Sequence, residues 1–252
     1  MNRTMKGVDL SVSTLADTSA VHYDLAVLPW GATEPHNRHL PYLTDAILAQ
    51  AVSVEAACKA APVRCMVLPP VTFGSQNPGQ REQPFCIHAS YRTQCAMLTD
   101  VVASLHHQGM RRLAIVNGHG GNSFRNMVRD LAVAYPDFAI ACCEWYATVP
   151  REGFFDAPGE HADELETSVM LHYRPELVDL PAAGEGRARP FAMACLNEKT
   201  LWLPRDWSKV TSDTGIGDPR GATAEKGARF AEAVTDRLAA AFRQFATEPI
   251  YT

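Results

Sequence analysis

The sequence predicts an α/β fold, a three-layer α/β/α sandwich in which helices cover both faces of a mostly parallel central sheet. Short apolar segments alternate along the chain with longer segments of helical pattern, which is typical of a parallel sheet built from right-handed crossovers. The apolar segments are apolar on both faces, as strands of a covered sheet require. No linker, repeat or low-complexity tract divides the chain, so residues 1–252 are predicted to form a single domain.

Four apolar segments predict the strands of this sheet. Each is short and rich in Val, Ile, Leu or Cys, so we expect all four strands to be buried. They are residues 23–30 (YDLAVLPW), 63–70 (VRCMVLPP), 111–118 (RRLAIVNG) and 138–145 (FAIACCEW).

The helical patterns lie between and after these strands, at residues 44–60, 90–108, 121–135 and 222–246. Thr44 is expected to cap the first of these helices, and Asp45 is favoured near its positive end. Ser90 is expected to open the second helix. Gly109 is expected to end it, because glycine readily adopts the left-handed conformation that follows many helices.

Composition narrows the classes of function. The net charge is −5 and no run of Lys or Arg exceeds two residues, which argues against nucleic acid or an anionic membrane as the partner. No apolar run approaches the about 18 residues that span a bilayer, and the first twenty residues lack the apolar core of a secretory signal. The seven scattered cysteines form no CxxC motif. We therefore expect a cytoplasmic protein with reduced and mostly buried thiols.

Two polar loops directly follow predicted strands, and such loops meet at one edge of a parallel sheet. The first, GATEPHNRHLPYLTD at 31–45, contains Glu34, His36, His39 and Asp45. Imidazole nitrogens and carboxylate oxygens are ligands of Zn²⁺ and Mn²⁺, and a carboxylate at the start of the next helix can bridge two ions. The alternative is that the acids cap helices and the histidines lie on the surface.

The second loop, NGHGGN at 117–122, places His119 among glycines that tolerate positive φ and let a ligand approach the backbone closely. The following helix presents free N–H groups to anions, so Gly120 and Gly121 are candidates for stabilising an oxyanion. A glycine-rich turn with an incidental histidine is the alternative. A phosphate-binding loop is a weaker interpretation, since the Lys-Ser/Thr pair of a P-loop is absent.

A third segment, GEHADELETS at 159–168, offers His161 and Glu166 at a predicted helix start. A histidine acid/base and a glutamate ligand there would complete a hydrolytic site. Asp163 and Glu166 also have the spacing of a capping box, and a capped helix without metal explains the pattern equally well.

Other residues give weaker signals. Cys86 and His88 face the same side of an extended segment, but no third group is available to orient them as a thiol nucleophile and its base. Trp145, Trp202 and Trp207 are candidates for the lining of a pocket.

In their order along the chain, these segments resemble the creatininase (creatinine amidohydrolase) family. The resemblance is carried by EPHNRHLPYLTD at 34–45, NGHGGN at 117–122 and HADELETS at 161–168. The segment GIGDPRGATAEKG at 215–227 is similar to the family's Asp-Pro segment before the last helix, so the resemblance spans almost the whole chain. It implies an α/β sandwich amidohydrolase, often hexameric, that uses two divalent ions, Zn²⁺, Mn²⁺ or Fe²⁺.

The resemblance also implies roles for single residues. His161 would be the proton shuttle. The metal ligands would be Glu34, His36, Asp45 as the bridge, His119 and Glu166, and the last of these would also belong to the catalytic machinery. Contacts to the substrate, or to the ligands from behind, are expected from His39, Asn117, Gly120, Gly121 and Trp145.

The expected reaction is hydrolysis of a C–N amide bond in a cyclic amide, a formamide or a similar small substrate, rather than in a peptide. A hydroxide held between the ions would attack the amide carbon, and His161 would protonate the leaving nitrogen. A non-catalytic member that kept the metal site, and a peptide-cleaving member, are the alternatives. All the expected ligands and His161 are present, which favours an enzyme.

Several departures from the family concern the substrate. Gly121 stands where creatininase itself has a glutamate, Asn37 stands where the family usually has glycine, and NPGQREQPFCIHAS at 77–90 replaces H-x-x-F-P-G-T. The short segment between Trp145 and His161 has no second tryptophan to clamp creatinine. Creatinine is therefore not expected to be the best substrate, and Asn37 and Arg38 are expected to mark the difference.

Overall fold

The computed structural model describes residues 5–252 and contains the predicted parallel sheet. Its four strands all run in the same direction, in the order β2-β1-β3-β4, with Val27 of β1 aligned to Val67 of β2 and Ala114 of β3. The strands are β1 (Leu25–Trp30), β2 (Cys65–Val67), β3 (Arg112–Asn117) and β4 (Ala139–Glu144). Each lies inside one of the four predicted segments.

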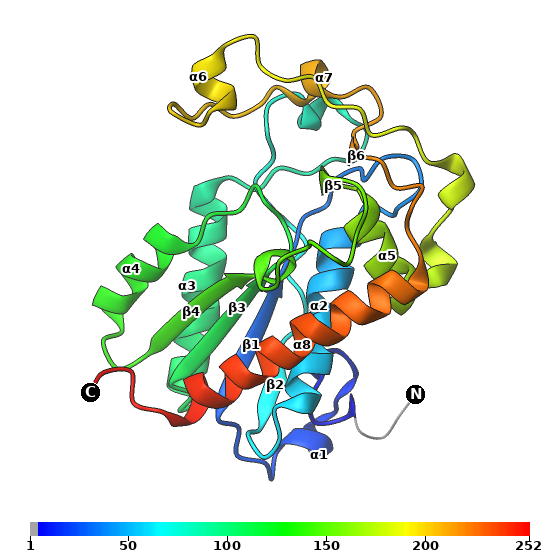
Figure 1. Cartoon of the computed structure of the whole chain (residues 1–252). Coiled ribbons are helices and arrows are strands. Elements are labelled where there is room, and N and C mark those ends of the chain that lie inside the picture. Colours follow the sequence, from blue (N-terminus) through cyan, green and yellow to red (C-terminus); the bar gives the residue numbers. More distant parts are fainter. Residues whose placement is uncertain (1–4) are drawn as a thin grey trace.

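Helices cover both faces of this sheet, which confirms the three-layer prediction (Figure 1). Alternate residues of β1 serve the two layers: Leu25 and Val27 belong to one core cluster, Ala26 and Leu28 to the other. The first cluster includes residues of α2 (Thr44–Lys59), α5 (Glu164–Tyr173) and α8 (Ala224–Thr247). The second includes residues of α3 (Tyr91–His107) and α4 (Arg125–Ala134).

The helix ends agree with the sequence at some positions and differ at others. Ser90 caps α3 by accepting a hydrogen bond from the Thr93 N–H, and Gly109 follows the helix with φ of +90°. Thr44 is not the cap of α2: it is the first helical residue and its hydroxyl donates to the carbonyl of Pro41. The helix predicted from residue 121 begins only at Arg125, so residues 118–124 form a loop.

The first turn of α2 lies against the carboxyl ends of β1 and β3 because two glycines allow it. A Cβ atom at Gly31 would lie 2.4 Å from the backbone nitrogen of Ala46. A Cβ atom at Gly118 would lie 2.5 Å from the carbonyl oxygen of Asp45. Glycine at both positions therefore lets the helix approach closely enough to bring Asp45 to the edge of the sheet.

β4 is an edge strand, and this corrects the expectation that all strands and most cysteines are buried. Its residues are only partly covered, and Cys142 in its middle is exposed. Cys65 of β2 is the one buried cysteine of the seven, and all seven are free thiols.

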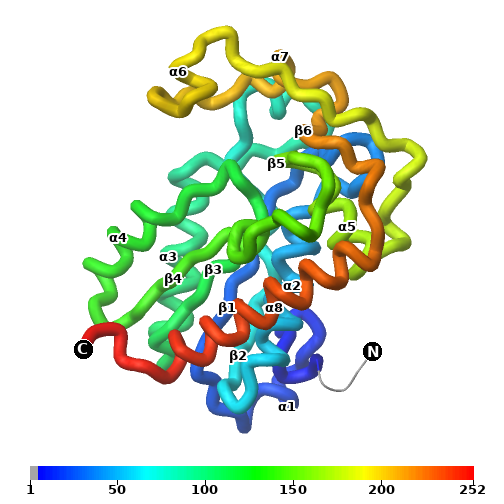
Figure 2. Tube along the Cα trace, in the orientation of Figure 1, coloured from blue at the N-terminus to red at the C-terminus, as the bar shows by residue number. Residues whose placement is uncertain are grey.

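The segment that follows α5 passes above the carboxyl ends of the strands, as Figures 1 and 2 show. It contains α6 (Ala194–Asn197) and α7 (Trp207–Val210), and it reaches a small antiparallel sheet of β5 (Gly159–His161) and β6 (Ile216–Gly217). Short helices elsewhere are α1 (Leu15–Thr18), η2 (Leu10–Val12), η3 (Gln80–Glu82), η4 (Trp145–Ala147), η5 (Pro175–Leu177) and η6 (Leu180–Ala182). Within residues 5–252, no helix is both long and apolar enough to cross a membrane.

Candidate metal centre

Six buried side chains from separate parts of the chain converge at the carboxyl edge of the sheet. Their potential ligand atoms form three overlapping sets, and within each set the atoms lie within 4.8 Å of one another. The sets are Glu34–Asp45–His119, His36–Asp45–Glu166 and Glu34–His36–His161. Glu34, His36 and Asp45 each belong to two of these sets, and Asp45 is the residue that joins the Glu34–His119 pair to the His36–Glu166 pair. All five residues predicted as ligands, and the predicted shuttle, are therefore brought together.

His36 comes from the loop after β1 and is fully buried. Its Nδ1 donates to the backbone carbonyl of Glu34 at 3.1 Å, which leaves Nε2 to face the carboxylates. Nε2 lies 3.0 Å from Asp45 Oδ1 and 3.9 Å from Glu166 Oε2.

His119, in the loop after β3, is oriented in the same manner. Its Nε2 donates to the carbonyl of Ser75 at 2.8 Å. Its Nδ1 then faces Glu34 Oε1 at 2.8 Å and Asp45 Oδ2 at 3.1 Å. A backbone carbonyl that fixes the protonated nitrogen is the usual way to aim the other nitrogen of a histidine at a metal.

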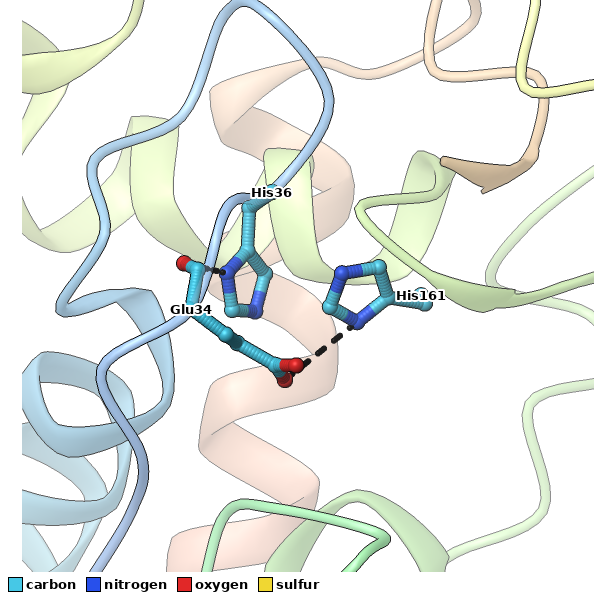
Figure 3. Close-up of side chains that lie close together, drawn as sticks. All are labelled: Glu34, His36 and His161. Carbon is cyan, nitrogen blue, oxygen red and sulfur yellow. Dashed lines mark hydrogen bonds and ion pairs between the residues drawn. The ribbon is translucent and has the colours of Figure 1, made fainter. Parts of the chain in front are cut away.

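His161 ends β5 and faces Glu34 beside the ring of His36 (Figure 3). Its Nε2 donates to the carbonyl of Pro35 at 3.0 Å, and its Nδ1 lies 3.8 Å from Glu34 Oε1. The edge of Trp207 packs against the imidazole, with ring centroids 5.6 Å apart. Burial, together with the positive charge of His36, lowers the pKa of His161, so a neutral imidazole is favoured.

Glu166 serves two structural purposes at once. Its backbone N–H donates to Asp163 Oδ1 at 3.1 Å, so Asp163 is the N-cap of α5. Its carboxylate accepts a hydrogen bond from the N–H of Ala162 at 2.6 Å and also belongs to one ligand set. The two interpretations of this segment, a capped helix and a metal ligand, are therefore compatible.

The ionisable groups of the centre shift one another strongly. Burial opposes the protonation of His36, but the nearby Asp45 carboxylate raises its pKa to about 10, and the pKa of His119 rises for the same kind of reason beside Glu34. Burial would raise the pKa of Asp45, yet the charge of His36 holds it well below the usual range. For Glu166, burial prevails and raises the pKa to about 8.

The donor set fits divalent cations. Three buried carboxylates, Glu34, Asp45 and Glu166, share one centre, and buried carboxylates are costly without positive partners. Within residues 5–252, their only salt-bridge partners are histidines, and no Lys or Arg reaches them. Asp45 Oδ2 is buried and faces His119 Nδ1 at 3.1 Å. Nitrogen and oxygen donors of this kind match Zn²⁺ or Mn²⁺.

The centre opens into a cavity of about 1050 Å³. Gly120 and Gly121 line this cavity, as predicted for residues on the substrate side. Trp202 and Trp207 also belong to its wall, whereas Trp145 is 1% exposed and packs in the core against Phe230.

His39 and Asn117 lie behind the ligands rather than in the wall of the cavity. His39 is buried, its Nε2 lies 2.8 Å from Thr167 Oγ1, and burial lowers its pKa to about 4. The Asn117 side chain accepts from the N–H of His119 and donates to the carbonyl of the same residue. Asn117 therefore shapes the loop that carries a ligand.

The glycines of the second loop are needed for space, which corrects the prediction that they provide positive φ and a helix terminus. Neither Gly120 nor Gly121 has positive φ, and α4 begins beyond the loop. A Cβ at Gly121 would lie 2.1 Å from the Ser75 carbonyl and 2.5 Å from His119 Nε2. Gly121 therefore makes room for the hydrogen bond that orients His119.

Asn37 and Arg38 do not line the cavity, so the expectation that they mark substrate specificity is not supported by their positions. Asn37 has φ of +54°, which explains why glycine would also fit there. Its side chain binds both backbone groups of Gly184 and so fastens the segment after α5.

Burial raises the pKa of the Cys86 thiol to about 11, which disfavours a thiolate nucleophile.

Three residues that contribute to the site were not predicted from the sequence: Gln80, Ser75 and Tyr146. Gln80 is 1% exposed and its amide donates to Glu34 Oε2, while Ser75 offers the carbonyl that orients His119. Tyr146 lines the cavity. The departure of residues 77–90 from the family pattern was the one available signal for Gln80.

Comparison with known proteins places this centre in a family. Residues 9–242 match the family model for creatininase, creatinine amidohydrolase. The chain belongs to the creatininase family. A solved structure from Bacteroides fragilis, provisionally described as a creatinine amidohydrolase, is 55% identical, with a TM-score of 0.97 over 100% of both chains.

The characterised relatives that this chain resembles have more than one activity. A mycofactocin precursor peptide peptidase from Mycobacterium ulcerans is 32% identical over 83% of this chain and 81% of its own length. A creatinine amidohydrolase from Pseudomonas putida is 26% identical over 86% and 88%. A creatininase solved with Mn, at 24% identity and a TM-score of 0.80 over 97% of this chain and 100% of the other, shares the fold.

Proposed function

We propose that this chain is a metal-dependent amidohydrolase that cleaves a C–N amide bond with two divalent ions, Zn²⁺, Mn²⁺ or Fe²⁺, as cofactors. The observation that carries the proposal is that the two oxygens of the buried Asp45 carboxylate face different histidines: Oδ1 lies 3.0 Å from His36 Nε2, and Oδ2 lies 3.1 Å from His119 Nδ1. A carboxylate shared in this way is how closely spaced ions are commonly held. Ions bound there would acidify a water molecule and polarise the carbonyl of the amide.

The ligand atoms divide naturally around Asp45. Glu34 and His119 would hold one ion together with this carboxylate, and His36 and Glu166 would hold the other. The backbone carbonyls that fix both histidines, and the amide of Gln80 on Glu34, support this assignment because they aim the free donor atoms at the centre.

His161 is proposed as the proton shuttle. Its Nε2–H is engaged by the Pro35 carbonyl, so Nδ1 carries the lone pair that faces Glu34. Its lowered pKa keeps Nδ1 free to accept a proton from the attacking water and to return it to the leaving nitrogen. Trp207 packs against the ring at an interplanar angle of 87°, and His161 is buried.

The proposed substrate is a small molecule with an amide bond, such as a cyclic amide or a formamide. A peptide is the second candidate, and two observations favour it. The cavity of about 1050 Å³ is larger than a single small ring needs, and the chain is 32% identical to a peptidase that acts on a peptide precursor.

A non-catalytic metal-binding protein of the same fold is less consistent with the residues. Such a protein would tolerate loss of a ligand or of the proton shuttle, yet all six side chains are present and oriented.

Family resemblance also supports a homo-oligomer, with a hexamer as the expected size. Size-exclusion chromatography with light scattering measures this directly.

A substrate screen of the metal-loaded protein tests the proposal. Cyclic amides, formamides and short peptides are incubated with protein loaded with Zn²⁺ or Mn²⁺, and release of amine or carboxylate is measured. We expect turnover of at least one class, loss of turnover with a chelator, and recovery on adding metal back. Turnover that persists in an Asp45→Asn variant, or after complete metal removal, would refute the metal-dependent mechanism.

A further inference from the structure

The hydroxyl of Tyr146 is a polar group of the cavity that the proposed mechanism has not used. Tyr146 lines the same cavity as Glu34, Asp45 and Glu166. Its hydroxyl forms no hydrogen bond with any group of residues 5–252, although the phenol is partly buried. A phenol in such a place commonly finds a partner in what binds beside it.

The ring that carries this hydroxyl is held firmly. Tyr146 lies in η4, directly after β4, and packs against the core cluster beneath α8. The ring of the buried Trp145 contacts it edge-on, with centroids 6.0 Å apart and an interplanar angle of 80°. Packing therefore holds the ring of Tyr146 in place, and the hydroxyl at its end faces the cavity.

Gly120 leaves the space in front of this hydroxyl open. A Cβ at Gly120 would lie 3.6 Å from the Tyr146 oxygen and would meet no other heavy atom within 4 Å. A longer side chain there would occupy the space between the phenol and the loop that carries His119. In this chain that space is accessible to a bound molecule.

The same surroundings keep the phenol protonated. Burial raises the pKa of Tyr146, and the negative charges of Glu144, Asp45 and Glu166 raise it further. Tyr146 is therefore a hydrogen-bond donor throughout the neutral pH range.

We propose that Tyr146 is a catalytic residue of the amide hydrolysis proposed above, on which this inference rests. Its hydroxyl donates a hydrogen bond to the carbonyl oxygen of the bound amide. That bond strengthens as the oxygen gains negative charge during attack on the carbon, so it lowers the barrier more than it tightens substrate binding. The phenol keeps its proton throughout, and His161 remains the group that carries the proton.

A Tyr146→Phe variant tests this role, with Tyr135→Phe as the matched control. Tyr135 is also partly buried, but it belongs to the core cluster beneath α3 and α4 and contacts His106. Metal content is measured first by mass spectrometry. The dissociation constant of acetohydroxamate, a small chelating anion with an oxygen that can accept from the phenol, is then measured by calorimetry on the Mn²⁺-loaded proteins.

We expect Tyr146→Phe to keep its metal content and to bind acetohydroxamate about tenfold more weakly than the wild type, with Tyr135→Phe unchanged. A Gly120→Leu variant should also lose the anion while it keeps the metal, because the side chain fills the space beside the phenol. On any amide that the wild type hydrolyses, Tyr146→Phe should lower kcat by about tenfold or more and change KM little.

Equal acetohydroxamate affinity in wild type and Tyr146→Phe, or no binding to the metal-loaded wild type, would overturn the inference. The outcome for the proposed function is read separately. Tyr146-dependent anion binding without turnover of any amide would support the role of Tyr146 as a donor and refute amidohydrolase activity. Absence of bound metal in the wild type would refute both.

Discussion

The three histidines of the centre share one arrangement. Each donates one ring N–H to a backbone carbonyl, and the three carbonyls belong to Glu34, Ser75 and Pro35. The second nitrogen of each ring then faces the carboxylates. Two of these carbonyls lie in the same loop as His36, so the path of that loop fixes the tautomers of a ligand and of the proton shuttle together.

Mutation of His161 distinguishes most clearly between the roles of proton shuttle and metal ligand. We expect His161→Ala to keep its metal content and to lower turnover by about 10²–10⁴-fold, as loss of a general acid/base does. Metal analysis and steady-state kinetics measure the two effects, with His107→Ala, an exposed residue late in α3, as the control. Loss of one ion from the variant would identify His161 as a ligand, because it also belongs to a potential ligand set.

Gln80 is predicted to hold Glu34 in position. Its amide donates to Glu34 Oε2, and its own Oε1 accepts from the N–H of Asn77 at 2.7 Å. Gln80→Ala should weaken metal binding by about tenfold, since residues that orient ligands commonly contribute that much. Gln80→Glu keeps the length of the side chain but removes the N–H donor, so Glu34 should lose the same hydrogen bond in this variant.

Calorimetric titration of the chelator-treated variants with Zn²⁺ measures the Gln80 effect. Gln83→Ala is the control, since Gln83 follows in the same loop and its side chain forms no hydrogen bond within residues 5–252. Wild-type affinity in both Gln80 variants would show that Glu34 is oriented without Gln80.

At the scale of elements, the strands and long helices follow from sequence pattern alone. β1 and β3 lie within the predicted segments, and α3 differs from its prediction by one residue at each end. Their signals are local, since buried strands are uniformly apolar and helices carry caps. β4 was predicted as buried because pattern alone does not tell an edge strand from a central one.

The segment between α5 and α8 was not predicted in detail, and its residues explain why. It contains only short helices and the two-residue strand β6, so it carries no hydrophobic period. Its place over the site depends on distant contacts, such as the Asn37 bonds to Gly184 and the ion pair of Arg205 with Glu160. Gln80 and Tyr146 were not predicted either, because their places beside the site also depend on contacts with residues that are distant in the sequence.

The N-terminus of α5 links helix stability to the site. Asp163 caps the helix through the N–H of Glu166 and pairs with Arg151 at 2.9 Å. Asp163→Ala should lower the free energy of unfolding by about 1 kcal/mol, the usual cost of losing such a cap. It should also weaken metal binding, because the first turn of the helix carries Glu166.

Urea unfolding and metal titration of the Asp163 variants check this prediction. Asp163→Asn keeps an oxygen that can accept from the Glu166 N–H, so it should retain most of the stability. Equal stability in Asp163→Ala and the wild type would show that other contacts fix the start of α5.

At the scale of the whole molecule, metal binding and proton binding compete. His36 and His119 have raised pKa values in the metal-free chain and carry protons at neutral pH, whereas metal binding requires bare nitrogens. Metal affinity should therefore rise with pH, and binding at pH 7.5 should release protons. Calorimetry in buffers of different ionisation enthalpy counts them, and binding without proton release would contradict the assignment of both histidines as ligands.

The same protons should affect the stability of the metal-free protein. A histidine whose pKa is raised in the folded state stabilises the folded chain at pH values below its ordinary pKa of about 6.5. That contribution is lost as the pH rises toward the pKa in the folded state, which is about 10 for His36. Thermal unfolding with chelator present should thus occur at lower temperature as pH rises from 7 to 10. Added metal should raise the unfolding temperature most at the alkaline end.

The central claim is that one shared carboxylate organises a site for two ions. The most direct measurement is the number of Zn²⁺ or Mn²⁺ ions retained per chain after metal loading and gel filtration, determined by elemental mass spectrometry for the wild type and for Asp45→Asn. The account predicts two ions per wild-type chain and the loss of both in the variant, since Asp45 joins the Glu34–His119 pair to the His36–Glu166 pair. A wild-type chain that retains no ion, or an Asp45→Asn chain that still retains two, would contradict it.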